Sequence, residues 1–206
     1  MIKLYGTPPT RALRVIWLLN ELGIEYEMLP VGLLQGENKQ QAFLTLNPAA
    51  KVPVLVDGSL VVTESAAIQL YLAEKHPQAG FIPEAVEGRA QMYRWIFFLV
   101  TEIEQPLWRI ARHTFVYPKE KRLPQDIDLA RQECLDMVAV LDRHMEEREF
   151  MVANRLSVAD FTAAYTLDWA NEEKMLDGTP RLREYLRSMY ARPTAPPTIA
   201  EARAAL

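Results

Sequence analysis

Every strand signal in this chain lies within its first 76 residues, and this one-sided distribution limits the folds that it can adopt. Residues 2–5 (IKLY) predict a strand that ends in a Gly-Thr-Pro-Pro turn. Residues 11–23 predict a helix that ends at Gly23, where a left-handed C-cap is favourable. Residues 24–31 alternate well enough to predict a second strand, which completes a strand–helix–strand unit.

A short helix and a hairpin follow this unit. Residues 38–48 predict a helix that stops at a proline. The Asp57-Gly58-Ser59 sequence lies between two apolar runs, 52–56 and 60–63, and is a strong hairpin signal. Helical spacing in residues 65–76 then adds a helix, so the predicted order is βαβ followed by ββα.

The pattern changes after a segment rich in proline and glycine. We therefore predict a first domain at residues 1–76, a linker at 77–85 and an all-helical domain at 86–206. A long helix is expected from about 86 to 112, with a kink at Pro106. Further helices are expected after the basic loop 118–126 and within 156–170 and 179–191, with a short helical segment at the C-terminus.

Composition excludes several classes of function. The 23 basic and 27 acidic side chains give a net charge of -4, which argues against a protein that binds nucleic acid through its phosphates. The single cysteine, Cys134, allows no internal disulfide and fits a reducing compartment. The three histidines, His76, His113 and His144, are scattered and predict no metal site.

We expect no membrane partner and a cytoplasmic location. The residues that follow Met1 do not resemble a signal peptide. The longest apolar runs, such as VIWLL and WIFFLV, are far shorter than the roughly 20 residues that span a bilayer.

Ser157 and Asp160 form a variant of the capping box, with a hydroxyl at the N-cap and a carboxylate three residues later. Because an apolar run follows directly, we interpret this motif as a structural helix start and not as a binding site.

Pro53 lies at the start of a predicted strand, where a residue without an amide hydrogen needs a local explanation. The βαβ plus ββα order is the thioredoxin-like arrangement, in which a proline at this place is typically cis. A cis X-Pro bond costs only about 0.5–1 kcal/mol and would turn the Val52 N–H and C=O toward an extended peptide-like ligand. The alternative is an ordinary edge proline.

Glu64 and Ser65 lie where the last strand meets its helix. Free N–H groups and the positive end of the helix dipole attract a carboxylate there, and Ser65 can hydrogen-bond it. Glu64 can hold an ammonium group, so the pair suits an α-amino acid head group. A simple helix cap is the alternative interpretation.

Three segments together resemble cytosolic glutathione transferases in order and spacing, and the resemblance covers nearly the whole chain. They are RVIWLLNELGIEYE, LNPAAKVPVLVDGSLVVTESAAIQLYLAEKHP and LSVADF. The VPxL, DG and ESxAI elements are jointly specific. The resemblance, to bacterial and fungal members of the theta, phi and nu type, implies a thioredoxin-like α/β N-terminal domain plus an all-α C-terminal domain.

The resemblance implies a glutathione site in the first domain. The Val52 backbone would pair with the cysteinyl part of glutathione beside cis Pro53, and Glu64 and Ser65 would hold its γ-glutamyl end. Glutathione would be a co-substrate, with no tightly bound cofactor.

The glycine end of glutathione would lie near a lysine. Lys51 falls where related enzymes have glutamine or lysine, and Lys39 or Asn38 would meet the glycine carboxylate. For both lysines a solvated surface position remains the alternative.

The residue that activates the thiol has three candidates. The family places Ser, Tyr or Cys in the turn after the first strand, whereas this chain has two threonines there. Alignment through RALRVIW gives Thr10 the serine position, counting from cysteine-type members gives Thr7, and Tyr5 is the third candidate. We favour Thr10, although it is also a common N-cap. The absence of a turn cysteine disfavours a mixed-disulfide mechanism.

The resemblance places the second substrate between the domains, against the long helix. Trp108, Arg112 and Phe115 follow at helical spacing and would line an apolar pocket with a basic edge, or would pack in the core. We expect a homodimeric enzyme of detoxification that directs the glutathione thiolate at a hydrophobic electrophile or a peroxide. The alternatives are a non-catalytic interaction module of the same fold and a glutathione-dependent disulfide reductase or peroxidase.

Overall fold

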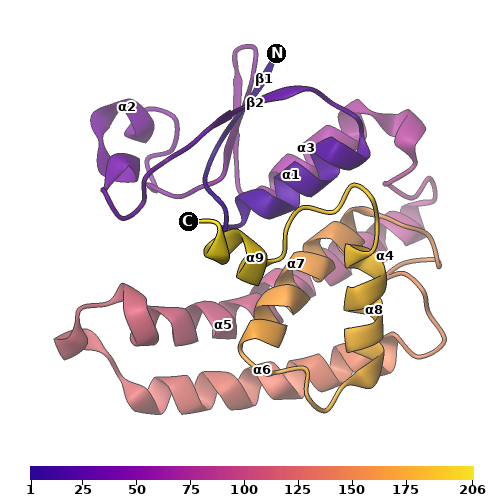
Figure 1. Cartoon of the computed structure of the whole chain (residues 1–206). Coiled ribbons are helices and arrows are strands. Elements are labelled where there is room, and N and C mark those ends of the chain that lie inside the picture. The colour runs from indigo at the N-terminus through magenta and orange to yellow at the C-terminus, as the bar shows by residue number, and fades with distance from the viewer. The chain divides into compact units, whose positions relative to one another are not determined.

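A computed structural model describes all 206 residues and divides them into two compact units. The first unit comprises residues 1–82 and 192–206, and the second comprises residues 83–191. Figure 1 shows the order of the elements along the chain. No helix is long and apolar enough to cross a bilayer.

The first unit contains a four-stranded mixed sheet in the order β2-β1-β3-β4. Its strands are β1 Ile2–Tyr5, β2 Tyr26–Leu29, β3 Val54–Asp57 and β4 Leu60–Thr63. β1 pairs parallel with β2 and antiparallel with β3, and β3 pairs antiparallel with β4. Asp57 faces Leu60 across a two-residue hairpin, and Gly58 has φ 61° there, so the predicted hairpin is confirmed.

Three helices belong to this sheet: α1 Ala12–Glu21, α2 Gln41–Leu44 and α3 Ser65–Lys75. α1 and α3 lie side by side, whereas α2 lies apart from them (Figure 1). The expected helix at 38–48 is shorter than predicted, because a separate 3₁₀ turn, Glu37–Lys39, ends at the extended residue Gln40. The thioredoxin-like order of elements is therefore confirmed.

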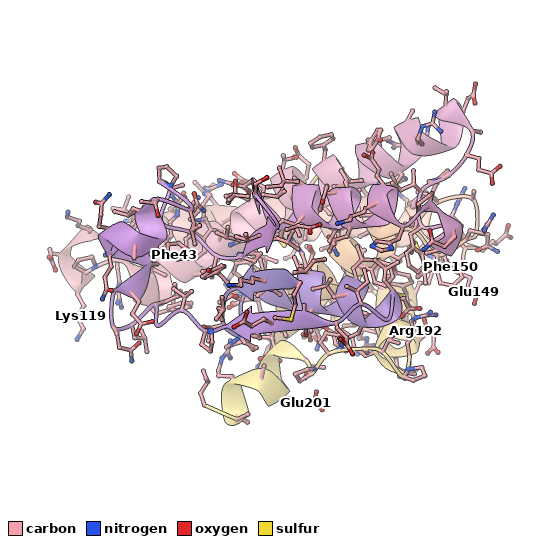
Figure 2. All side chains as sticks on the ribbon, turned by 90° about the horizontal axis from the view of Figure 1, so that it is seen from above. Phe43, Lys119, Glu149, Phe150, Arg192 and Glu201 are labelled. Atoms are coloured by element: carbon pink, nitrogen blue, oxygen red, sulfur yellow. The ribbon has the colours of Figure 1, made fainter.

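The second unit contains α4 Val86–Phe98, α5 Glu104–Ala111, α6 Pro124–His144, α7 Val158–Glu172 and α8 Pro180–Tyr190. Twelve of the fifteen residues of α7 are buried, as expected for a central helix. α5 and α6 run side by side (Figure 1), and Lys119 lies in the segment that connects them (Figure 2).

The predicted long helix continues to Val116 through two π-helical turns, Leu99–Ile103 and Arg112–Val116. Glu104 N–H donates to Leu99 O in the first turn, two residues before Pro106. A π turn is a recognised cause of a local irregularity in a helix, as is a proline. The irregularity expected at Pro106 thus begins before the proline itself.

The C-terminal segment differs from the prediction, which placed residues 86–206 in one helical domain. Residues 192–206, which include α9 Ile199–Ala204, group with the first unit. Arg192 forms an ion pair with Glu21, and the Thr194 hydroxyl donates to the same carboxylate. Figure 2 labels Arg192 and Glu201 in this segment. Contacts with α1, far away in sequence, determine where the segment belongs.

The predicted capping box at the start of α7 is confirmed. Asp160 is fully buried and its carboxylate accepts four hydrogen bonds, from Ser157 N, Ser157 Oγ, Met151 N and Tyr185 Oη. Burial raises the pKa of the Asp160 carboxyl to about 6, and the four donors oppose that rise. The motif therefore connects the α6–α7 loop and α8 to the start of α7.

The raised pKa predicts that Asp160 makes folding depend on pH. An unfolded Asp titrates near roughly pH 4, so the folded state binds this proton more tightly. Its stabilising contribution is complete below roughly pH 4 and is lost as pH rises through about 6, by on the order of 3 kcal/mol. Denaturant unfolding of the unmodified chain and Asp160→Asn from pH 4 to pH 7 measures this, because the variant lacks the titrating group. A stability difference independent of pH would contradict the assignment.

Candidate functional site

Val52 presents backbone groups that no part of the chain satisfies. The Val52–Pro53 peptide bond is cis, as predicted, and β3 begins only at Val54. The Val52 side chain packs against the cluster of Val31, Phe43 and Val54. Neither the Val52 N–H nor its C=O takes part in a hydrogen bond. A half-buried side chain thus anchors a residue whose backbone N–H and C=O are open to an extended ligand.

Glu64 and Ser65 mark the start of α3, as predicted. Glu64 has φ 65° and ψ 112°, a conformation that is unfavourable for a residue with a Cβ, and its exposed side chain has no hydrogen-bond or ion-pair partner. Outliers of this kind are concentrated at functional sites. Ser65 is buried, and the first N–H groups of α3 have no side-chain cap. Free donors, the helix dipole and an unpaired carboxylate therefore occur together.

The turn after β1 packs closely against the start of α1, and Gly6 makes this possible. A Cβ at Gly6 would lie 2.8 Å from Ala12 Cβ and 3.8 Å from Pro53 Cβ. The first distance is shorter than any normal carbon contact. The glycine therefore lets the turn that carries both threonines pack against α1, with Pro53 at ordinary contact distance.

The Thr7 hydroxyl has a structural role, because it bonds both backbone groups of Val31. The hydroxyl donates to Val31 O at 2.9 Å and accepts from Val31 N at 3.0 Å. Because a hydroxyl has one hydrogen, Thr7 has none left to donate to a bound sulfur. This geometry weighs against Thr7 as the activating residue.

Thr10 has a different hydrogen-bond arrangement. Its half-buried hydroxyl accepts from Ala12 N at 3.3 Å, at the N-terminus of α1, and donates to no group of the chain. Its hydrogen is available to a ligand, and the helix N-terminus lies beside it. Thr10 has the properties of both an N-terminal cap and a donor to an anion.

Tyr5 lies at the end of β1 and packs against the same apolar cluster as Val52. Its ring meets Phe43 edge-on, with centroids 6.5 Å apart. These contacts give the Tyr5 ring a packing role in the sheet.

The residues expected at the glycine end of glutathione differ in whether their side chains have partners within the chain. Lys39 and Lys51 are exposed, and neither forms an ion pair. Asn38 instead donates from Nδ2 to Ala50 O at 2.7 Å, and its Oδ1 is buried. Asn38 therefore connects the 3₁₀ turn to the loop before Val52, and the two lysines remain as possible anion contacts.

In the second unit, Trp108 lies on α5, and Arg112 and Phe115 lie on the second π turn. Trp108 is half-buried, whereas Phe115 is 64% exposed, which weighs against a core role for Phe115. The Arg112 guanidinium donates to Tyr117 Oη at 3.3 Å and lies near its ring. The π turn changes the helical spacing on which the prediction relied, so the three residues do not follow one regular stripe.

The sequence did not identify the contact between Arg14 and Ser65. Arg14 lies on α1, is 1% exposed and donates from Nη1 to Ser65 Oγ at 3.2 Å. Gln69 Nε2 donates to the Arg14 carbonyl at 3.0 Å. An arginine within the apolar run ALRVIW was the one available signal, since a buried arginine needs specific partners.

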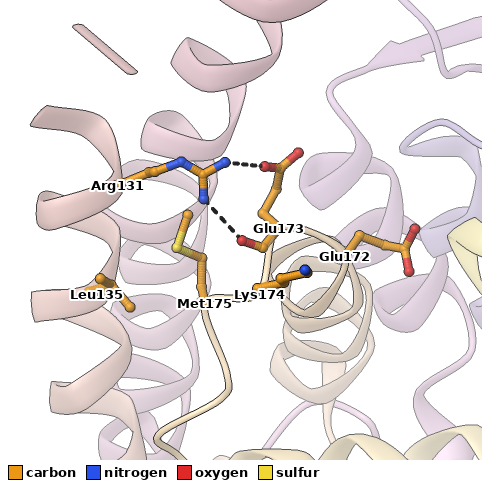
Figure 3. Close-up of a pocket in the computed structure, with 6 residues that line it drawn as sticks. All are labelled: Arg131, Leu135, Glu172, Glu173, Lys174 and Met175. Carbon is orange, nitrogen blue, oxygen red and sulfur yellow. Dashed lines mark hydrogen bonds and ion pairs between the residues drawn. The ribbon is translucent and has the colours of Figure 1, made fainter. Parts of the chain in front are cut away.

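The second unit has a hollow of about 360 Å³, and none of the predicted site residues lines it. Figure 3 shows its lining, which consists of Arg131, Leu135, Glu172, Glu173, Lys174 and Met175. Arg131 donates to the carbonyl and to the carboxylate of Glu173, which holds the C-terminal end of α7 to α6. Arg131 and Glu173 at this hollow therefore have a clear structural role.

Comparison with known proteins gives a consistent result. Residues 1–74 match the family model for the N-terminal domain of glutathione S-transferase, and residues 124–188 match that for its C-terminal domain. Glutathione S-transferase F9 of Arabidopsis thaliana is 31% identical over 78% of this chain and 76% of its own length. Disulfide-bond oxidoreductase YfcG of Escherichia coli (strain K12) is 26% identical over 94% of this chain and 92% of its own length. The crystal structure of glutathione transferase F7 from Populus trichocarpa has a TM-score of 0.84 at 24% identity, covering 98% of this chain and 99% of that one.

The close approach at Gly6 predicts a local stability effect. Gly6→Ala should lower the free energy of unfolding by about 1–3 kcal/mol, because the new Cβ must displace α1 or the turn. Chemical denaturation measures the change. Gly178→Ala is the matched control, since a Cβ there meets nothing within 4 Å and Gly178 does not require a positive φ. Equal stability of the two variants would contradict the tight contact.

Proposed function

The chain belongs to the glutathione S-transferase family, and we propose that its first unit binds reduced glutathione along Val52, Glu64 and Ser65 and activates the thiol at Thr10. The enzyme is a glutathione transferase, in which the bound tripeptide supplies the nucleophile. The observation that carries the assignment of the site is the unpaired Val52 N–H and C=O beside the uncapped start of α3.

The cysteinyl residue of glutathione pairs with Val52 as a short added strand would. The open N–H donates to the ligand's carbonyl, and the open C=O accepts from its N–H. Because the Val52 side chain is anchored in the apolar cluster, these two groups are already oriented before the ligand arrives. Preorganisation of this kind lowers the entropic cost of binding.

The γ-glutamyl end meets both of its charges at the start of α3. Its carboxylate accepts from the Ser65 hydroxyl and from free N–H groups of the helix, and its ammonium pairs with the exposed Glu64 carboxylate. At the other end, Lys39 and Lys51 meet the glycine carboxylate as flexible, solvated cations.

Thr10 lowers the pKa of the glutathione thiol. Its free hydroxyl hydrogen donates to the sulfur, and the α1 N-terminus stabilises the negative charge. The thiolate then attacks an electrophilic carbon, forms the C–S bond and expels the leaving group with its electron pair. With a peroxide, the thiolate attacks one oxygen, the O–O bond breaks and the other oxygen leaves as an alcohol or water. A second glutathione then converts the sulfenic acid to glutathione disulfide and water.

The second substrate is a hydrophobic electrophile that Trp108, Arg112 and Phe115 contact. An exposed phenylalanine, a half-buried tryptophan and a guanidinium offer apolar area with one positive edge. We place this enzyme in the cytoplasm as a homodimer that acts in detoxification, as the family resemblance implies.

Disulfide reduction through a protein cysteine is not a mechanism that this chain supports. Cys134 is fully buried on α6, and burial raises the pKa of its thiol to about 12. A thiol of that kind neither ionises at neutral pH nor reaches a substrate. Any reduction of a disulfide or peroxide would use the thiolate of glutathione itself, and activity assays should include both substrates beside an aryl halide.

We predict that Glu64 and Ser65 control the affinity for reduced glutathione. Calorimetric titration with reduced glutathione should give saturable binding, and Ser65→Ala or Glu64→Ala should weaken it about ten- to a hundredfold, because each removes a bond to a charged group. Asp177→Ala, a change at an exposed residue of the second unit, should leave the affinity unchanged. The absence of binding at millimolar glutathione would overturn the transferase assignment.

Substitution of the two threonines should have different effects, one on activation of the glutathione thiol and the other on stability of the fold. Thr10→Ala should raise the pKa of the bound thiol by about 1 unit, by loss of a hydrogen bond to the thiolate. Thr7→Ala should leave that pKa unchanged and should destabilise the fold by about 1–3 kcal/mol, because it leaves the Val31 groups unpaired. Ultraviolet absorbance of the thiolate against pH measures the first effect and denaturation the second. The opposite pattern would assign activation to Thr7.

A further inference from the structure

Arg14, on α1, contacts Ser65 of the proposed head-group site. Its guanidinium donates to Ser65 Oγ at 3.2 Å, and its own carbonyl accepts from Gln69 Nε2 at 3.0 Å. Ser65 and Gln69 lie one helical turn apart on α3, so they share a face of that helix. The Arg14 side chain and main chain are thus held against two successive turns of α3, and the residue is only 1% exposed.

The direction of the Arg14–Ser65 bond follows from its chemistry. A guanidinium has donors and no acceptor and does not lose its proton in proteins, so Ser65 Oγ must be the acceptor. Ser65 donates no hydrogen bond within the chain. Its hydrogen is therefore left for another group, on the side of the oxygen that faces away from Arg14.

We propose that Arg14 is a positioning residue for the α-carboxylate of the γ-glutamyl group. It holds Ser65 as an acceptor toward the protein, so that the Ser65 hydroxyl is always a donor toward the ligand. This role rests on the proposed binding of glutathione, and it assigns carboxylate recognition to a residue that does not touch the ligand.

The test compares two ligands: reduced glutathione and its analogue in which the γ-glutamyl α-carboxylate is an amide. The dissociation constant of the amide divided by that of reduced glutathione measures how strongly the site recognises the carboxylate. Arg14→Met, which keeps the length of the side chain without its donors, should lower this ratio about tenfold, as should Ser65→Ala. In the Ser65→Ala background, Arg14→Met should lower it no further, because both changes remove the same interaction.

Gln69→Met is the matched control. It removes the buried hydrogen bond from Gln69 to the Arg14 carbonyl and leaves the Arg14–Ser65 bond in place. If Arg14 only held α1 against α3, Gln69→Met should lower the ratio as much as Arg14→Met does. We expect its ratio to equal that of the unmodified chain. Arg14→Leu, which also has no donors, replaces the Met variant if the latter does not fold, with the same expected loss.

An unchanged ratio in the Arg14 variant, or an equal loss in Gln69→Met, would overturn the positioning role. Failure of the unmodified chain to bind either ligand would instead overturn the proposed function on which this role rests.

Discussion

The candidate site depends on one residue, Val52, whose backbone N–H and C=O are both unpaired. β3 starts at Val54 and not at Val52, and the Val52 side chain is anchored in the apolar cluster of Val31, Phe43 and Val54. The Val52 N–H and C=O therefore remain outside every ladder and turn. Unpaired backbone groups at a sheet are costly unless water or a ligand satisfies them. In the proposed function, glutathione satisfies both groups at once.

Two other features belong to the candidate site for separate local reasons. Gly6 lacks a side chain, so the turn that carries Thr10 can pack against α1. Glu64 has a positive φ at the start of α3, where Ser65 is held by Arg14. The proposed thiol activator, strand-like contact and charged head-group site therefore lie within one small unit. Each part is supported by packing that does not involve the ligand.

Local sequence signals predicted the order of elements, the hairpin at Asp57-Gly58, the cis bond before Pro53 and the capping box at Ser157. Long-range contacts decided the rest. Thr7 and Thr10 look alike in sequence, and they are distinguished by Val31, which lies 24 residues from Thr7. The segment 192–206 joins the first unit through Glu21, over 170 residues away. The π turns leave no trace in a helical pattern of apolar residues.

The most direct test of the account is to follow backbone amide resonances of the isotopically labelled chain during titration with reduced glutathione. Binding of glutathione along Val52 and α3 predicts saturable shifts of the Val52 amide and of the amides of residues 65–67 at the start of α3, with one common dissociation constant. Unmoved Val52 and α3 resonances, while other residues shift with saturation, would place the glutathione site elsewhere and contradict the account.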